Sequence, residues 1–325
     1  DFGFLNGRIS GSIDLYFNRT NDLLFYKSAP TSSVYPSVIS NVGKTKGHGF
    51  EMQLNTRVLD FKDFKWDIDW SYSTFTDEIT ALTDGVDKFE SGKTAMIVGE
   101  RVHTYLDYET YGTWGVGEYA DYIKNHKFYD ADGNEVAPSY IKTYGDPGTL
   151  KIVDRNNDGK IDANDRRTYN YDPSHLFGMN HTFTYKNFTL SVQVMARLGG
   201  YISYAMNNRI DYEPANWGEG CSDYWTPTNQ DAKFPSPGAD KATYTNYGSS
   251  LLYEKADFVK IKDITLGYNL PKSLISKIGL NNCKVYGSLK NFITFSHIDN
   301  FDPEAGGSYS FPLAKQAVIG INLEF

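Results

Sequence analysis

One short segment has the residue types and the spacing of a site for a hard cation. From position 154 to position 165 the chain reads Asp-Arg-Asn-Asn-Asp-Gly-Lys-Ile-Asp-Ala-Asn-Asp. Calcium-binding loops place oxygen ligands at loop positions 1, 3, 5, 9 and 12, a glycine at the sharp turn at position 6 and a backbone carbonyl at position 7. This spacing predicts a structural Ca²⁺ site, with the ligands Asp154, Asn156, Asp158, Lys160 through its carbonyl, Asp162 and Asp165.

Two features of this segment depart from the usual calcium-binding loop. Asp165 stands at the last position, where a longer, bidentate Glu is usual, and residues 149–153 before the loop favour an extended chain instead of a helix. The alternative is a polar Asp/Asn-Gly loop that is capped by its own side-chain hydrogen bonds. Because the segment lies in the longest irregular stretch of the chain, a bound ion would be structural and would not be a signal.

Aromatic residues in the irregular stretches form a second candidate site. Exposed rings can stack on sugar faces or hold peptide side chains, and the alternative is that they pack the loops against each other or against a partner. The residues predicted to contact substrate or a partner protein are Tyr108, Tyr111, Trp114, Trp217, Tyr224 and Trp225.

No combination of residues suits catalysis. The six His residues lack metal-ligand spacing, and the chain has neither a nucleophile elbow nor a phosphate-binding loop. Asp67 and Asp69 share a strand face, where a solvated pair is expected before an acid/base pair. The net charge is −8 and no basic tract stands out, which argues against nucleic acid as a partner. We therefore expect a protein that is not an enzyme.

The elements that position these residues are strands with a two-residue alternation. One face of each is apolar and the other is polar, because successive side chains of a strand point to opposite sides. A one-residue slip at Lys262-Asp263 predicts a β-bulge, and Pro271 to Gly279 can form one short helical turn. The alternating segments are 8–18, 50–58, 64–72, 177–185, 188–198, 251–269, 282–295 and 317–325.

Charge on the polar face of nearly every strand, together with the order of the connectors, favours a transmembrane β-barrel. The roughly eight strands alternate between short connectors and long ones, as in outer-membrane barrels with short periplasmic turns and long extracellular loops. A soluble sandwich would not need long loops at one end only. The short connectors lie near 59–63, 186–188 and 270–281, and the long ones near 28–46, 76–174, 199–250 and 296–313. The charged residues predicted to face an aqueous lumen are Arg8, Glu51, Arg57, Asp67 and Asp69.

Composition agrees with this all-β, antiparallel barrel. Hydrophobic residues make up 40% of the 325 residues and no run of about 18 apolar residues occurs, which excludes a helical membrane protein. The aromatic share of 15% suits girdles at the two membrane interfaces. The strand order places the C-terminus on the periplasmic side.

Four segments, in this order, resemble the C-terminal part of SusC-like (RagA-type) TonB-dependent transporters of Bacteroidota. The resemblance covers essentially the whole chain. The segments are Asn-Val-Gly-Lys-Thr with Gly-Phe-Glu in 41–51, the 154–165 loop, 223–235 with its Asp-Tyr-Trp-Thr-Pro-Thr-Asn, and 259–271 with its Lys-Asp-Ile-Thr-Leu-Gly-Tyr-Asn-Leu-Pro.

The resemblance implies an outer-membrane protein with a 22-stranded barrel and an N-terminal plug domain. Residues 1–325 would be the C-terminal portion of that barrel, with the plug and the N-terminal strands absent from this chain. It further implies import of glycan or peptide fragments, powered through TonB, with a SusD-like surface lipoprotein as a lid. Residues 317–325 would then pair with the strand around Val285 to Leu289 on one side and with a strand outside this sequence on the other.

Two other functions remain open from the residues alone. One is a complete outer-membrane barrel of about eight strands with a structural or adhesion role, whose first and last strands would pair. The other is a secreted, calcium-dependent, glycan-binding β-sandwich.

Overall fold

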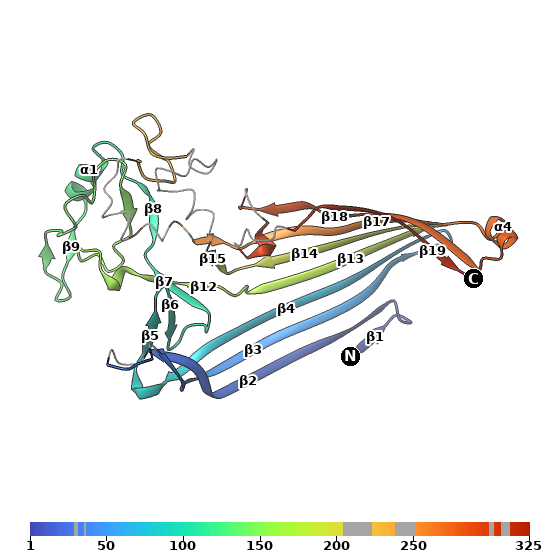
Figure 1. The fold of residues 1–325 in the computed structure, drawn as a ribbon, viewed down its shortest axis with the longest axis horizontal. Helices are drawn as coiled ribbons and strands as arrows, with labels where there is room; N and C mark the ends of the chain where they lie inside the picture. The colour runs from blue at the N-terminus through green and yellow to red at the C-terminus, as the bar shows by residue number, and fades with distance from the viewer. Residues whose placement is uncertain are drawn as a thin grey trace.

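A single antiparallel sheet of nine strands dominates the fold, in the order β1-β2-β3-β4-β13-β14-β17-β18-β19 (Figure 1). The structure is a computed structural model that describes residues 1–28, 32–35, 37–203, 223–237, 247, 251, 253–298, 302–306 and 313–325. The nine strands are β1 (Phe2–Phe4), β2 (Ile9–Ser28), β3 (Ser37–Asp60), β4 (Phe64–Leu82), β13 (His175–Tyr185), β14 (Phe188–Leu198), β17 (Phe258–Asn269), β18 (Asn282–Ser296) and β19 (Gln316–Glu324).

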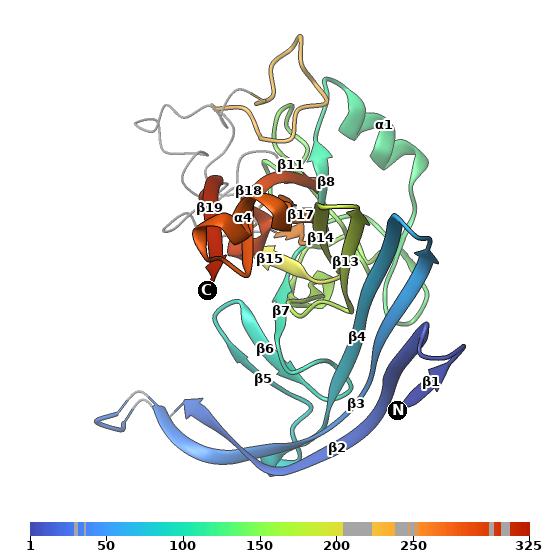
Figure 2. The same cartoon turned by 90° about the vertical axis from the view of Figure 1, so that its right-hand side faces the viewer.

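The sheet curves into an open trough (Figure 2). In the described part of the chain, β1 pairs only with β2 and β19 pairs only with β18, so the two edge strands do not meet. A complete small barrel with paired first and last strands is therefore not what this chain forms. A sandwich, which needs two large sheets packed face to face, is not formed by the described residues either, because the other sheets have two to four strands.

The predicted alternation is confirmed by the register of the strands. Directly opposite residues of neighbouring strands lie on the same face of a sheet, so paired residues form rows across it. One row near the middle contains no charged side chain, and it runs Thr56, Ile68, His181, Val192, Ile264, Leu289 and Ala317. We call the side that carries this row the apolar face, and the opposite side the polar face.

Short turns join the strands at one end, as predicted. A two-residue turn at Lys186 and Asn187 joins β13 to β14, and α4 (Lys272–Ile275) with η5 (Ser276–Ile278) lies between β17 and β18. The turn after η5 needs φ of 77° at Gly279, a left-handed conformation that glycine adopts without steric cost. The C-terminus lies at this end, because Glu324 pairs with Asn282 next to the short helix (Figure 1).

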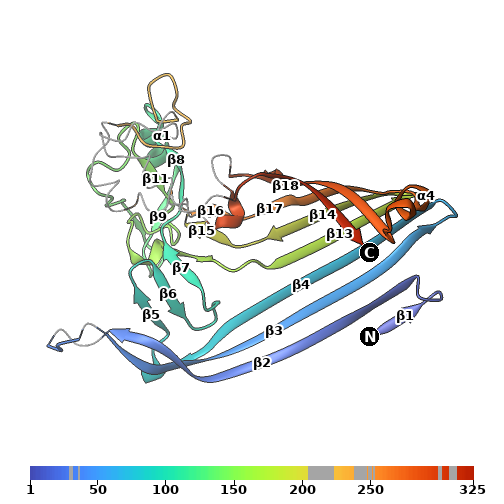
Figure 3. The same ribbon diagram turned by 45° about the vertical axis from the view of Figure 1, so that its right-hand side comes forward.

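The prediction of a long connector near 28–46 is wrong. Ser37 pairs with Ser28, and the β2–β3 ladder continues from there to Thr56, which makes β3 the longest strand at 24 residues (Figure 3). Residues 37–46 do not alternate between apolar and polar side chains, because they lie beyond the part of the sheet where one face must be apolar. Likewise β4 runs to Leu82, so the next connector starts later than predicted.

The predicted β-bulge is confirmed at Lys262. Val194 pairs with Ile261, whereas its neighbour Gln193 pairs with Asp263, so Lys262 is the extra residue. The pairing of β17 with β18 shifts at the same place. The bulge keeps both Ile261 and Ile264 on the apolar face although they are three residues apart.

The long connectors fold into small sheets and short helices at the opposite end of the trough (Figure 1). Their elements are η1 (Thr83–Gly85), β5 (Lys88–Ser91), β6 (Thr94–Ile97), β7 (Thr104–Asp107), β8 (Thr110–Thr113), α1 (Glu118–Asn125), β9 (Phe128–Tyr129), β10 (Glu135–Val136), β11 (Leu150–Ile152), η2 (Ala163–Asp165), β12 (Arg167–Asn170), β15 (Tyr201–Ser203), β16 (Tyr253–Lys255) and η6 (Pro303–Ala305). Among the described residues, no helix has the length and apolar character to cross a membrane.

A hydrophobic cluster joins two of these connectors. We call it the loop core; its buried members are Trp114, Tyr144, Leu150, Ile152, Phe234, Tyr247 and Leu251. Because the cluster combines residues between 114 and 152 with Phe234, Tyr247 and Leu251, the described parts of the two longest connectors pack against each other.

Candidate functional site

The predicted ion-binding segment forms a tight loop between β11 and η2. Asn157 and Gly159 have φ of 58° and 75°, and these left-handed conformations turn the chain back on itself. Asp154 accepts hydrogen bonds at Oδ1 from the amide of Asp158, at 3.1 Å, and at Oδ2 from the amide of Gly159, at 2.8 Å. The hydroxyl of Tyr140 also donates to Oδ2 of Asp154, at 2.9 Å.

The remaining predicted ligands also bond to neighbours within the loop. Oδ1 of Asp158 accepts from the amide of Lys160 at 2.9 Å, and its Oδ2 accepts from the side-chain amide of Asn156 at 2.9 Å. The buried Asp165 accepts from the amides of Asp162 and Arg155, at 2.7 and 2.9 Å. No group of three or more His, Cys, Asp or Glu residues among the described positions is arranged to hold a metal. The loop thus has the self-capped form, with oxygen donors at the predicted spacing.

Ion pairs attach both ends of this loop to the surrounding strands. Glu109 accepts from Arg155 at 3.0 Å and from Arg167 at 2.5 Å, so one carboxylate spans the entry and the exit of the loop. Arg166 forms a bidentate pair with Glu90 of β5, at 2.8 and 3.1 Å. Bidentate pairs fix orientation as well as distance, so they set the position of the loop.

The Arg166–Glu90 pair predicts a pH-dependent stability of this region. Hydrogen bonds from Arg166 and then from Lys88 hold the pKa of Glu90 below its usual value. A carboxylate with a lowered pKa stabilises the folded state above its unfolded pKa of about 4.3, and this contribution disappears as the pH falls through the folded pKa. We expect Glu90→Gln to lower the protease resistance of residues 83–174 at neutral pH, with the difference from the parent shrinking below about pH 4.

A matched control for this prediction is Glu135→Gln. Glu135 also pairs with a cation, Lys127, but both side chains are more than half exposed, so a smaller effect is expected. A loss for Glu90→Gln that is the same at neutral and acidic pH would contradict the assignment.

The predicted contact aromatics divide into two groups. Trp114 and Trp225 are only 1% and 7% exposed, so they do not present their rings to a ligand, and the prediction for these two is wrong. Trp114 instead packs edge-on against Tyr144, with ring centroids 5.8 Å apart. Tyr111 and Tyr224 are exposed and Tyr108 is half-buried. Trp217 lies outside the described residues.

The charged residues predicted for a lumen share the polar face. Arg57 and Asp67 are paired in register and form an ion pair of 2.9 Å. Arg8 donates to the backbone carbonyl of residue 58, at 3.0 Å. Asp69 accepts from the side chain of Asn180 at 3.3 Å. Glu51 precedes Arg57 by six residues on β3 and therefore points to the same side.

Aromatic residues border the apolar face at two levels. At the loop end, Tyr72 and Phe177 are paired in register, with ring centroids 4.7 Å apart. At the turn end, Tyr185 pairs with Phe188, which contacts Tyr268 at 4.6 Å. Positions 177 and 185 of β13 are about 26 Å apart along an extended strand. This matches the apolar band of about 25 Å between the aromatic girdles of outer-membrane barrels.

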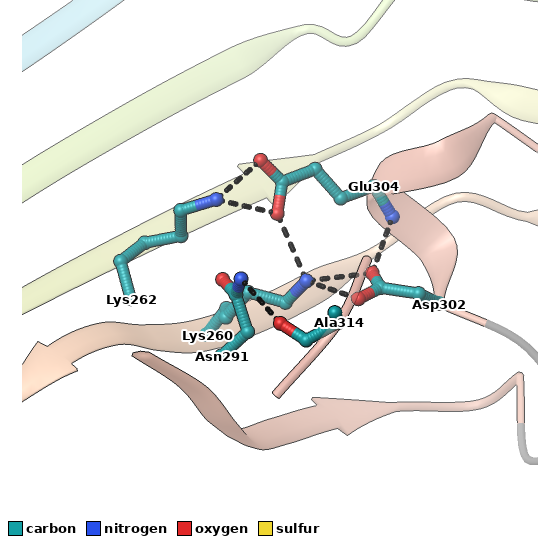
Figure 4. A network of polar contacts seen from close by, with 6 residues as sticks. All are labelled: Lys260, Lys262, Asn291, Asp302, Glu304 and Ala314. Atoms are coloured by element: carbon teal, nitrogen blue, oxygen red, sulfur yellow. Dashed lines mark hydrogen bonds and ion pairs between the residues drawn. The ribbon is translucent and has the colours of Figure 1, made fainter. Parts of the chain in front are cut away.

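One polar network was not predicted from the sequence. Nζ of Lys260 on β17 lies 2.6 and 2.5 Å from the two carboxylate oxygens of Asp302 and 2.9 Å from Glu304, and Lys262 also bonds to Glu304 (Figure 4). Lys260 and Lys262 are two charges close together on one strand, and this is the only signal in the sequence that partners are needed. Nothing in the sequence indicated that residues more than 40 positions away supply them.

Comparison with known proteins is consistent with these features. Residues 1–145 match the family described as "TonB dependent receptor-like, beta-barrel". TonB-dependent receptor P3 of Formosa agariphila is 27% identical over 341 residues, which cover 100% of this chain and 33% of that protein. TonB-dependent receptor SusC of Bacteroides thetaiotaomicron is 28% identical and is matched over 31% of its length.

The chain resembles part of a TonB-dependent receptor β-barrel. It spans about a third of the length of the curated relatives that it matches. A solved structure titled "Structure of the RagAB peptide transporter" superposes with a TM-score of 0.74 and 23% identity, over 99% of this chain and 34% of the other, and so shares the fold.

The similarity to TonB-dependent receptors confirms three of the predictions. The sheet is a portion of a transmembrane barrel, the chain is located in the bacterial outer membrane, and it is similar to receptors and is not an enzyme. The apolar face of the receptor accordingly faces lipid, and the small sheets lie at the end with the long loops.

Proposed function

We propose that the receptor to which this chain belongs imports nutrients across the outer membrane in a TonB-dependent manner, with glycan or peptide fragments as cargo. A SusD-like surface lipoprotein would cover the loops as a lid, and energy would come through TonB by way of the rest of the receptor. Arg8, Glu51, Arg57, Asp67 and Asp69 would line the path of the cargo, while Tyr111 and Tyr224 would face the lid or the cargo.

The observation that carries this proposal is the division of the sheet into two faces. A pure scaffold in the membrane needs the lipid-facing band but has no need for paired charges along its other side. Here the polar face carries ion pairs and hydrogen-bonded polar side chains on β3, β4 and β13, such as Arg57 with Asp67 and Asn180 with Asp69. A hydrated interior of this kind suits the passage of a polar cargo. Relatives with names such as SusC and a fold shared with a peptide transporter agree with it.

The test uses the complete receptor in its own cells. Uptake of fluorescently labelled oligopeptides and of labelled oligosaccharides is measured in cells with the receptor, without it, and with TonB inactivated. We expect uptake of one of the two cargo classes only in the first strain. Equal uptake in all three strains would refute the proposal, and purification of the tagged receptor without a lipoprotein partner would refute the lid.

We propose in addition that the 154–165 loop binds Ca²⁺ as a structural ion. Asp154, Asn156, Asp158, Asp162 and Asp165 would be the side-chain ligands, with the carbonyl of Lys160. When bound, the ion would neutralise several carboxylates at once and hold the loop closed. Support comes from the donor chemistry, all oxygen, and from Gly159 at the turn with its φ of 75°.

Calcium should therefore stabilise the loop of the full-length receptor. At a hundredfold excess over the dissociation constant, binding is expected to add about 2.7 kcal/mol to local stability. The measurement is hydrogen exchange of residues 154–165 with Ca²⁺ and with a chelator. Asp158→Ala, which removes the oxygen ligand, should remove the difference, whereas Asp132→Ala, at an exposed acid in a neighbouring turn, should keep it. Exchange that does not respond to Ca²⁺ in the parent would refute the site.

A further inference from the structure

The connector between β18 and β19 folds back onto the polar face of β17. Its short helix η6 brings Asp302 and Glu304 to Lys260, whose side chain is completely buried (Figure 4). Close to β19, the carbonyl of Ala314 accepts a hydrogen bond of 3.2 Å from the side chain of Asn291 on β18. The connector is thus fastened at two places, near its middle and near its end.

The charges in this network balance. Lys260 and Lys262 supply two positive groups, and Asp302 and Glu304 supply two negative groups, with Nζ of Lys262 at 2.6 and 2.8 Å from the carboxylate of Glu304. Burial alone would raise the pKa of Glu304, but hydrogen bonds from Lys260 and Lys262 lower it, so the carboxylate is ionised at neutral pH. A binding site for a charged ligand would leave charge unpaired, whereas these four groups satisfy one another. The network therefore serves to hold the connector.

The fastened connector lies beside the junction of three loops. Ile202, Ala256 and Ile298 form a buried cluster, and Tyr171 packs against it. These residues come from the connectors β14–β17, β18–β19 and β4–β13, each close to the point where its loop leaves the sheet. Gly306 approaches this junction, because a side-chain carbon at that position would lie 3.6 Å from the hydroxyl of Tyr171. A shift of η6 would therefore reach all three loops.

We propose that Lys260 and Lys262 are positioning residues of the import path, which hold residues 302–306 on the polar face at the loop end of β17 and so shape the mouth of that path. Lys260 lies two residues after the start of β17, at the end of the sheet from which the long loops leave. Asp263 follows Lys262 directly at the bulge. Its carboxylate accepts a hydrogen bond of 2.6 Å from the hydroxyl of Ser288 on β18, and this bond connects β17 with β18. The inference rests on the proposed import function.

The test uses charge reversal in the full-length receptor with two readouts. Lys262→Glu places a second carboxylate beside Glu304, and Glu304→Lys places a third cation beside the two lysines. The double variant Lys262→Glu/Glu304→Lys restores the balance of charge. Lys277→Glu is the matched control, because Lys277 is exposed in η5 at the opposite end of β17. Lys262 is preferred to Lys260 as a target because its side chain is 26% exposed and tolerates a change without burying a charge.

The first readout is hydrogen exchange of the amides of Glu304, Ala305 and Gly306, which are bonded within η6. We expect about tenfold faster exchange in each single variant and near-parent exchange in the double variant and in Lys277→Glu. The second readout is uptake of the labelled cargo, which should fall in the single variants and recover in the double variant.

The outcomes separate the two proposals. Unchanged exchange in both single variants, or no recovery in the double variant, would overturn the network as a fastening. Faster exchange with unchanged uptake would overturn the positioning role. A parent receptor that imports no cargo would refute the proposed function, and the import half of the inference with it, while hydrogen exchange would still decide whether the network holds the connector.

Discussion

Trp114→Ala is expected to unfold the loop core while the large sheet stays folded. The side chain is 1% exposed and contacts Tyr119, Tyr122 and Tyr144, and its loss would leave a cavity that these rings cannot fill. Large-to-small changes of this kind cost about 3–5 kcal/mol. Because the loop core joins two connectors, residues 110–152 and 223–237 should lose protection together.

Limited proteolysis and hydrogen exchange of the full-length receptor would measure this effect. Tyr111→Ala is the matched control, since Tyr111 lies on the adjoining strand and is 54% exposed. We expect a small change for the control and no change in β13 or β14 for either variant. Equal protection of residues 110–152 in the parent and in Trp114→Ala would show that the loop core does not hold these connectors.

Val192→Arg is expected to destabilise the receptor in lipid far more than the same substitution at the next position. Val192 occupies the middle row of the apolar face, opposite His181 and Ile264, whereas Gln193 points to the polar face opposite Asn180 and Asp263. Arginine on the lipid side at the bilayer midplane costs about 2–4 kcal/mol. On the polar side it meets water and a carboxylate, so Gln193→Arg should be nearly neutral.

Folding of the full-length receptor into lipid vesicles in a denaturant series measures both variants side by side. The unfolding midpoint should drop for Val192→Arg and stay close to that of the parent for Gln193→Arg. A reversed order, or equal shifts, would mean that the two faces are assigned the wrong way round.

Alternation was a sufficient signal for the strands inside the membrane, because lipid and water impose opposite demands on successive residues. Residues 177–185 and 188–198 were predicted with nearly the observed bounds, and the slip at Lys262 revealed the bulge. The same logic fails for residues 37–46, which extend as β3 past the membrane, where water on both sides removes the demand for alternation.

Contacts across the sequence explain the other failures. Trp114 is buried because Phe234, 120 positions later, belongs to the same cluster, and no local pattern carries that information. Asp302 and Glu304 lie in an irregular stretch where charges are usually solvated, so their pairing with Lys260 follows only from the folded connector. In the 154–165 loop the local spacing predicts the turn at Gly159, whereas the hydrogen bonds from backbone amides to Asp154 follow from the folded chain.

The length of the β2–β3 hairpin has a mechanical consequence. The hairpin continues for 13 residues of β3 beyond Phe50, from Gly49 back to Ser37, which is up to about 43 Å along the strand. A tilt of about 10° at the base of this hairpin would displace its far end by up to about 7.5 Å. Because β4 remains paired with β3 as far as Gly43, a modest change of twist in β2, β3 and β4 would thus become a displacement of several ångström at the far end of the hairpin, without any rearrangement of hydrogen bonds within the hairpin.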